Sequence, residues 1–323
     1  GPLAFIAESA VLYQHGVSPF IAANISLFDK RLLIVPQIRF EVMNWSGYRG
    51  RPEAYSFTHF RPEPRVNMRF QATKWMTIKA AMGVYNQFPD AIAFASSLGN
   101  PSVQPQTSWH YVLGFEFKPT PTLSIDTQVF YKDLFHLVVR GQTSDEPNFL
   151  NEGRGRVYGA ELLIKQALFK NFYGWLSYTV LRSERKDHPN APWRTFQFDQ
   201  THILTLIASY MLPKGFQIAV RFRYVTGNPT TPITGSFYSA NDNSFTPIYG
   251  APYSERLPAF HQLDARIDKT WTFNRWKLSL YVDIQNVYNY RSAELWNYSY
   301  DYSQRQRISG LPFLPVFGLK GEF

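Results

Sequence analysis

"WKLSLYVDIQ", residues 276–285, alternates without a break between apolar and polar side chains. The apolar positions are Trp276, Leu278, Leu280, Val282 and Ile284. The positions between them are Lys277, Ser279, Tyr281, Asp283 and Gln285. Because successive side chains of a β-strand point to opposite faces of the sheet, this stretch predicts a strand with one apolar and one polar face.

The same alternation recurs along the chain and predicts about fourteen strands. They are expected near residues 3–13, 18–27, 31–43, 57–72, 75–86, 106–118, 122–136, 155–167, 172–184, 198–212, 215–227, 258–271, 275–289 and 306–323. Most are about 10–16 residues long, whereas strands of globular proteins average about 5–6 residues. A tilted strand that crosses a membrane needs about 9–11 residues, so the lengths favour membrane-spanning strands.

The connections between these strands alternate in length. Short turns are expected at 28–30, 72–74, 118–121, 169–171, 212–215 and 273–275, and long loops at 44–56, 87–105, 137–154, 185–197, 228–257 and 290–305. Short turns at one end and long loops at the other are typical of outer-membrane barrels. We therefore expect an all-β fold, a transmembrane up-and-down antiparallel β-barrel. A soluble β-sandwich or propeller would also alternate, but its connections would not sort by length.

The composition agrees with this fold class and excludes others. The chain has 323 residues, of which 27 are Phe, 20 Tyr and 8 Trp, and it has no cysteine. It contains no apolar run long enough for a transmembrane helix. The formal net charge of +9 is scattered and forms no basic run, so nucleic acid is not expected as a partner.

The strand pattern continues to the last residue of the chain, in "LPVFGLKGEF" (314–323). Gram-negative outer-membrane proteins commonly end in Phe, which the barrel-assembly machinery reads, with Gly six positions from the end. Phe323 and Gly318 match this signal, while Gly321 stands where an apolar residue is usual. We expect the cell outer membrane, with the C-terminus periplasmic and the wall in contact with the lipid bilayer and lipopolysaccharide.

Several segments resemble one family of outer-membrane proteins in the same order. Within 85–117, the residues that match the signature Asn-Pro-x-(apolar)-x-Pro-Glu are Asn100, Pro101, Val103 and Pro105, with Gln106 in place of Glu. Within 20–41, the residues that match a segment ending in Pro-Gly-Leu-Arg are Pro36, Ile38 and Arg39, with Gln37 in place of Gly. Residues 157–168, 175–186, 280–289 and 317–323 fit later strands. Over most of 18–323 the chain resembles the C-terminal part of TonB-dependent outer-membrane receptors.

The resemblance carries expectations about domains and function. The family's barrel has 22 strands and is filled by an N-terminal plug, which follows a short box that contacts TonB. Residues 1–323 are then expected to be the C-terminal barrel portion, with the plug and the TonB box outside this chain. TonB would act through that missing N-terminal region. The implied function is energised uptake of an unknown extracellular ligand captured by the loops. A non-transporting barrel that scaffolds an envelope assembly through a protein partner, and a passive porin, stay open as alternatives.

Two groups of residues are candidates for function. The aromatic side chains of the two longest C-terminal loops are candidates for ligand capture: Phe237, Tyr238, Phe245, Tyr249, Tyr253, Trp296, Tyr298 and Tyr300. Aromatic residues supply rigid contact surface, although packing of the loops on themselves would use the same residues. Charged residues on three neighbouring strands are candidates for lining the lumen: Arg221, Arg223, Asp264, Arg266, Asp268, Lys277 and Asp283. Their mixed signs favour a wall of ion pairs over a route for an anion.

The sequence gives no sign of catalysis. The seven histidines show no metal-ligand spacing, so no metal site is predicted. The glycines of "GRGRVYG" (153–159) open a strand rather than a helix, so they do not predict a nucleotide site. We expect no enzyme activity and no cofactor.

Overall fold

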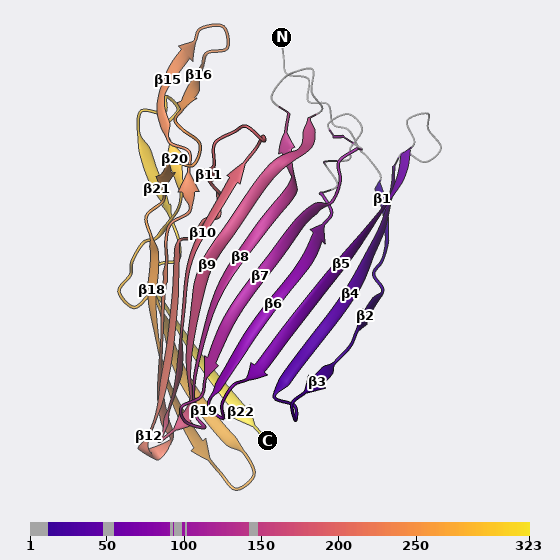
Figure 1. Cartoon of the computed structure of the whole chain (residues 1–323). Helices are drawn as coiled ribbons and strands as arrows, with labels where there is room; N and C mark the ends of the chain where they lie inside the picture. Colours follow the sequence, from indigo (N-terminus) through magenta and orange to yellow (C-terminus); the bar gives the residue numbers. More distant parts are fainter. Residues whose placement is uncertain (1–11, 48–54, 91–92, 94–98, 101, 142–147) are drawn as a thin grey trace.

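The computed structural model describes residues 12–47, 55–90, 93, 99–100, 102–141 and 148–323, and these form antiparallel strands joined by turns and loops (Figure 1). The wall strands are β1 (Leu12–Val17), β4 (Leu32–Gly47), β5 (Tyr55–Gln71), β6 (Met76–Gln87), β7 (Gln106–Phe117), β8 (Leu123–Arg140), β9 (Phe149–Phe169), β10 (Phe172–Lys186), β12 (His202–Leu212), β13 (Phe216–Val225), β18 (Phe260–Thr272), β19 (Lys277–Gln285) and β22 (Leu314–Glu322). Three short strands join the same sheet: β2 (Phe20–Ala22), β3 (Ile25–Leu27) and β11 (Arg194–Thr195).

The wall strands pair in sequence order from β1 to β22, so the all-β, up-and-down antiparallel architecture is confirmed. The described residues form a curved 16-stranded sheet in which β1 and β22 lie at opposite ends of the strand order. Short turns lie at one end of the strands, and the long loops lie at the other (Figure 1).

Prolines divide two of the strands that the sequence predicts as continuous. The segment 18–27 breaks into β2 and β3, with Ala23 between them. Ala23 donates its N–H to the Pro36 carbonyl at 3.1 Å, but Pro36 has no N–H to return the bond. The predicted strand 306–323 reaches the wall only at Leu314, after Pro312 and next to Pro315. The predicted strand 3–13 lies almost entirely outside the described residues.

The two longest C-terminal loops contain strands of their own, which corrects their interpretation as plain loops. Residues 228–257 hold β14 (Pro229–Thr230) paired with β17 (Glu255–Arg256), and β15 (Ile233–Ser239) paired with β16 (Ser244–Tyr249). Residues 290–309 hold β20 (Ala293–Tyr298) paired with β21 (Arg305–Ser309). These hairpins extend beyond the wall at its loop end (Figure 1).

The register gives the wall one apolar and one charged face. On β18, Leu263, Ala265 and Ile267 lie opposite apolar residues of β13 and β19. We call this apolar side the lipid face and the opposite, charged side the lumen face. Ile267 keeps 43% of its surface exposed, and many large apolar residues of the lipid face are similarly exposed. An apolar surface of this extent suits contact with hydrocarbon.

Aromatic residues bound the lipid face at both ends. Toward the long loops, Trp109, Tyr111, Tyr131 and Tyr158 form a row with ring centroids about 6.5 Å apart. Toward the short turns, Trp276 stacks on Phe273 at 4.5 Å. With a rise of about 3.3 Å per residue and a tilt of about 40°, β9 rises roughly 28 Å between Tyr158 and Phe169, close to the apolar band of membrane barrels. We call these rows the aromatic belts.

Candidate functional site

The predicted lumen-lining residues lie together on β13, β18 and β19, where the described charges are largely paired. Arg221 binds Asp264 at 2.6 Å, and Asp264, only 6% exposed, also accepts bonds from Gln262 and the Asn286 N–H. Arg266 binds Asp268 at 2.6 Å and lies 3.8 Å from Asp283.

The other two cations of this group have different surroundings. The Arg223 guanidinium lies 5.5 Å from the centre of the Phe260 ring. Lys277 lies at the short-turn end, where it is opposite Glu322 in the register. This arrangement supports the interpretation that these residues form a water-facing wall with ion pairs.

The predicted loop aromatics divide between the two hairpins. Phe237, Tyr238, Phe245 and Tyr249 lie on β15–β16, and Trp296 and Tyr298 lie on β20, with Tyr300 at the turn that follows. Phe245 packs against Tyr238 at 5.2 Å and against Tyr300 at 5.5 Å. The Tyr300 hydroxyl donates to the Asn243 carbonyl, and the Ser236 hydroxyl donates to the Asp301 carbonyl at 2.5 Å. These contacts join the two hairpins.

The turn of the second hairpin is organised around a carboxylate. The Ser299 and Ser303 hydroxyls donate to Asp301 at 2.6 and 2.7 Å. These hydrogen bonds lower the pKa of Asp301 to about 2. The turn therefore keeps its negative charge at any pH above that value.

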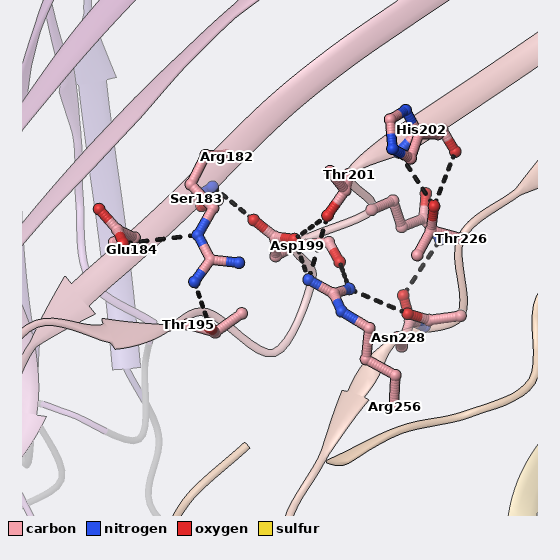
Figure 2. A network of polar contacts seen from close by, with 12 residues as sticks. Arg182, Ser183, Glu184, Thr195, Asp199, Thr201, His202, Thr226, Asn228 and Arg256 are labelled. Carbon is pink, nitrogen blue, oxygen red and sulfur yellow. Dashed lines mark hydrogen bonds and ion pairs between the residues drawn. The ribbon is translucent and has the colours of Figure 1, made fainter. Parts of the chain in front are cut away.

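A buried carboxylate that the sequence did not single out ties the longest loop to the wall (Figure 2). Asp199 has no exposed surface, and it accepts bonds from Arg256 at 2.5 Å, the Ser183 N–H at 2.6 Å and the Thr201 hydroxyl at 2.9 Å. Arg256 also donates to the carbonyls of Asp199 and Gly227, at 2.6 and 3.1 Å. The Asp199–Arg256 pair thus fixes the end of loop 228–257 on the strand ends.

Two arginines that the sequence also missed lie next to this tie. Arg185 on β10 and Arg194 on β11 are direct neighbours across the strands. Arg185 lies 3.9 Å from the centre of the Phe196 ring, and Arg194 lies 5.0 Å from that of Tyr253. Tyr253 thus contacts the arginine pair, whereas the other predicted aromatic residues belong to the two hairpins. In the sequence the arginines are nine positions apart, and only the β10–β11 pairing brings them together.

The arginine pair has free hydrogen-bonding capacity. Arg194 binds Asp187 at 2.7 Å, but its Nη1 is buried and has no hydrogen-bond partner among the described residues. The Nε of Arg185 is likewise buried, and no described residue accepts its hydrogen. A buried donor without an acceptor costs about 1–3 kcal/mol. The pair thus holds two N–H donors that an added oxygen acceptor would satisfy.

A hollow of about 420 Å³ opens at the same end of the wall. Its lining includes Arg223, Asn228, Phe260 and Glu294. Asn228 accepts a bond from Gln200, which follows Asp199 in the chain, so the hollow adjoins the tie. The loop end thus combines a mixed-charge hollow, aromatic hairpins and arginine donors.

The segment 100–105, which carries the Asn-Pro signature, holds together another part of the long-loop end. Val103 is 1% exposed and forms a small apolar core with Trp45 and Ala93. The Asn100 side chain donates to the Phe149 carbonyl at 2.8 Å and accepts the Ser102 N–H at 3.0 Å. Pro101 lies outside the described residues.

The two residues of the predicted assembly signal lie on and next to β22. Gly318 lies under the lumen-facing Tyr281, where an added Cβ would come within 2.1 Å of the ring. Arg266 covers the same ring at 3.9 Å. Phe323 stacks on Trp276 of the short-turn belt at 6.1 Å. Their role in assembly stays a prediction.

The described part of the chain offers no candidate for a metal site or for a helical membrane span. No three His, Asp or Glu side chains there are grouped so that they could hold a metal ion. No helix in that part is long and apolar enough to cross a membrane.

Solved structures share this fold at low sequence identity. The ferric citrate transporter FecA, unliganded, aligns with a TM-score of 0.73 at 17% identity over 97% of this chain and 46% of its own. The ferric-catecholate import receptor Fiu of E. coli K12 aligns with a TM-score of 0.70 at 13% identity, over 97% of this chain and 45% of its own. The ferric preacinetobactin receptor BauA of Acinetobacter baumannii aligns with a TM-score of 0.70 at 14% identity, over 97% of this chain and 43% of its own. The chain thus spans less than half the length of these proteins.

Sequence comparison gives the family directly. Among curated proteins, none matches the chain. The family model described as "TonB dependent receptor-like, beta-barrel" matches residues 7–287, most of the chain. The chain therefore belongs to the family of TonB-dependent receptor-like β-barrels.

Proposed function

We propose that the protein is an outer-membrane receptor that captures a ligand at the long-loop end of its barrel and takes it up with energy supplied through TonB. Membership of the family supports a receptor or transporter rather than an enzyme. In this proposal residues 1–323 are the C-terminal barrel portion. TonB acts through a plug region outside this chain.

The observation that carries ligand capture is the pair of unpartnered donors on Arg185 and Arg194. Both side chains are only partly exposed, so an anion bound there would be shielded from water. Tyr253 and Phe196 line the pair with aromatic surface. We infer an anionic ligand rich in oxygen acceptors. Among the structures with this fold, Fiu is a ferric-catecholate import receptor and FecA is a ferric citrate transporter.

The joined hairpins supply a second contact surface in this proposal. Phe237, Tyr238, Tyr249 and Tyr300 are each more than half exposed, and Tyr300 is 68% exposed. Exposed aromatic rings give large contact area at a low cost in side-chain entropy. They would contact the ligand before it reaches the arginine pair.

The orientation of the barrel is part of the proposal. We place the long loops outside the cell and the C-terminus in the periplasm. Phe323 then lies at the periplasmic interface, where the barrel-assembly machinery would read it. The hairpins face the medium, where the ligand is.

Cysteine labelling of intact cells tests this orientation. A cysteine at Asn243, in the β15–β16 turn, is expected to react with a membrane-impermeant maleimide. A cysteine at Asn274, in the short turn between β18 and β19, is expected to react only after lysis. Labelling of position 274 and not of position 243 on intact cells would show that the barrel has the opposite orientation.

Substitution of the arginine pair tests ligand capture. With ferric citrate and a ferric catecholate as probes, Arg185→Gln and Arg194→Gln should each raise the half-saturating concentration for uptake at least tenfold. The reason is that a hydrogen bond to a charged group contributes about 1.5–3 kcal/mol. Lys277→Gln, a lumen cation at the opposite end, serves as the matched control. Equal uptake by all variants at normal expression would exclude the arginine pair as the ligand site.

A further inference from the structure

A group of cations occupies the lipid face just beyond the long-loop belt. It consists of Arg154 and Arg156 on β9 and Arg182 and Lys186 on β10, which we call the basic rim cluster. Arg156 lies two positions from Tyr158 and so shares its face, and Arg182 lies directly opposite Tyr158. The Arg154 guanidinium lies 4.7 Å from the ring of Phe135 on β8.

Two cations of this cluster, Arg156 and Arg182, share the carboxylate of Glu184, and Asp133 on β8 lies directly opposite Arg156 in the register. Glu184 accepts from Arg156 at 2.7 Å and lies 3.4 Å from Arg182. Arg154 and Lys186 lie directly opposite each other. Lys186 donates to the Pro189 carbonyl at 2.5 Å, and neither cation has a carboxylate partner among the described residues. Like charges directly opposite in a sheet destabilise it, so this pair favours an anion supplied from outside.

An exposed tryptophan completes the surface. Arg156 lies 4.4 Å and Lys186 5.6 Å from the centre of the Trp193 ring. Trp193 remains 39% exposed. Tryptophan is enriched at the membrane interface, where one side of the ring meets lipid and the other meets headgroups.

The cluster is particular to one part of the wall. On β4, β5, β7, β12, β13 and β18, the described lipid-face residues near the long loops are uncharged or histidine: Asn44, Thr58, Thr107, His202, Tyr224 and His261. A general need for solubility at the rim would distribute cations over all strands. Their concentration on β9 and β10 indicates a local partner.

The height of the cluster identifies the layer that it meets. Along a strand tilted by about 40°, Arg156 and Arg154 lie roughly 5 and 10 Å beyond Tyr158. The headgroup layer on each side of a bilayer is about 5–8 Å thick. Arg156 therefore lies within the headgroup layer, and Arg154 and Lys186 lie just outside it, where their long side chains can reach back to headgroup phosphates.

We propose that the basic rim cluster binds a phosphate-bearing lipid headgroup of the outer leaflet, held between Arg154 and Lys186 and against Trp193. The phosphate would accept from both cations, neither of which has a carboxylate partner among the described residues, and would offset the repulsion between them. The site lies on the lipid face, so it is separate from the ligand site on Arg185 and Arg194. It requires the outward orientation of the long loops but not the proposed uptake.

Binding of diphosphoryl lipid A to the complete protein, purified from outer membranes in detergent and delipidated, tests the site. We expect Arg154→Gln/Lys186→Gln to weaken binding at least tenfold. Lys269→Gln should bind like the wild type. This matched cation lies on the same face at the short-turn end, 4.4 Å from the Phe216 ring. Heat-modifiable migration on gels confirms that each variant is folded.

Three outcomes would overturn the proposal. One is unchanged binding by the folded double variant, and another is equal binding of dephosphorylated lipid A, which would assign the contact to acyl chains. The third is displacement of lipid A by millimolar inorganic phosphate alone, which would indicate a site for a soluble anion. Selective loss of diphosphoryl lipid A in the double variant supports the headgroup site, whatever the result of the uptake experiments.

Discussion

Replacing Asp199 by alanine is expected to release loop 228–257 from the wall. The change leaves Arg256 without its anion and removes the acceptor of the Ser183 N–H and the Thr201 hydroxyl. Breaking a buried pair by removing one partner costs about 3–5 kcal/mol. Arg256 keeps 29% of its side chain exposed, so we expect the lower end, about 3 kcal/mol.

Proteolysis of the folded protein measures this release. Chymotrypsin cleavage near Phe245 and Tyr249 should accelerate about 100-fold, because every 1.4 kcal/mol corresponds to a factor of ten. Asp199→Asn should fall between the wild type and Asp199→Ala, since it keeps an acceptor but loses the charge. Asp242→Ala, at the exposed β15–β16 turn, is the control for a loop carboxylate outside the tie. Equal cleavage of Asp199→Ala and wild type would show that the loop is held elsewhere.

Arginine at position 267 is expected to cause a second large loss of stability. Ile267 lies on the lipid face of β18, about midway between His261 near one belt and Trp271 near the other. Arginine at the bilayer midplane costs about 2–4 kcal/mol, and the cost falls to about 0–1 kcal/mol near the interface. Leu280, closer to the short-turn belt, should therefore give a smaller loss when replaced by arginine. Denaturant unfolding in lipid vesicles measures both.

A lumen-facing position is the control for this series. Ser279 precedes Leu280, and its hydroxyl lies 2.9 Å from that of Thr270 on the lumen face. Ser279→Arg keeps its charge in water and should cost only about 0.5–1.5 kcal/mol, the contribution of the lost hydrogen bond to Thr270. A spin label at 267 should react to oxygen dissolved in lipid and be shielded from a water-soluble relaxation agent. A label that reports water would contradict the assignment of the two faces.

Alternation was sufficient to predict the wall because the period-two pattern depends only on which face each residue joins. The segment 276–285 alternates along its whole length, and its partners on β18 follow the same pattern. The breaks were harder to predict because they depend on residues of the neighbouring strand. Ala23 ends a strand because of Pro36, which lies 13 positions away.

The loop end was predicted less completely than the wall. Exposed aromatics could be counted in the loops, but their contacts depend on two hairpins that meet only in the folded chain. The Asp199–Arg256 tie joins residues 57 positions apart. A lone Asp and a lone Arg in two different loops carry no signal of such pairing. The arginine pair was missed for the same reason, since β11 is only two residues long.

The contacts between the β15–β16 and β20–β21 hairpins have a consequence for the kinetics of binding. Tyr300 is bound to Asn243 and packed on Phe245, so neither hairpin can swing without breaking contacts of the other. The entropy of ordering them is lost during folding rather than during an encounter. An arriving molecule meets a surface that is already set, and association needs no loop rearrangement. Differences in affinity between molecules that bind this surface should then arise mainly from how slowly each one leaves.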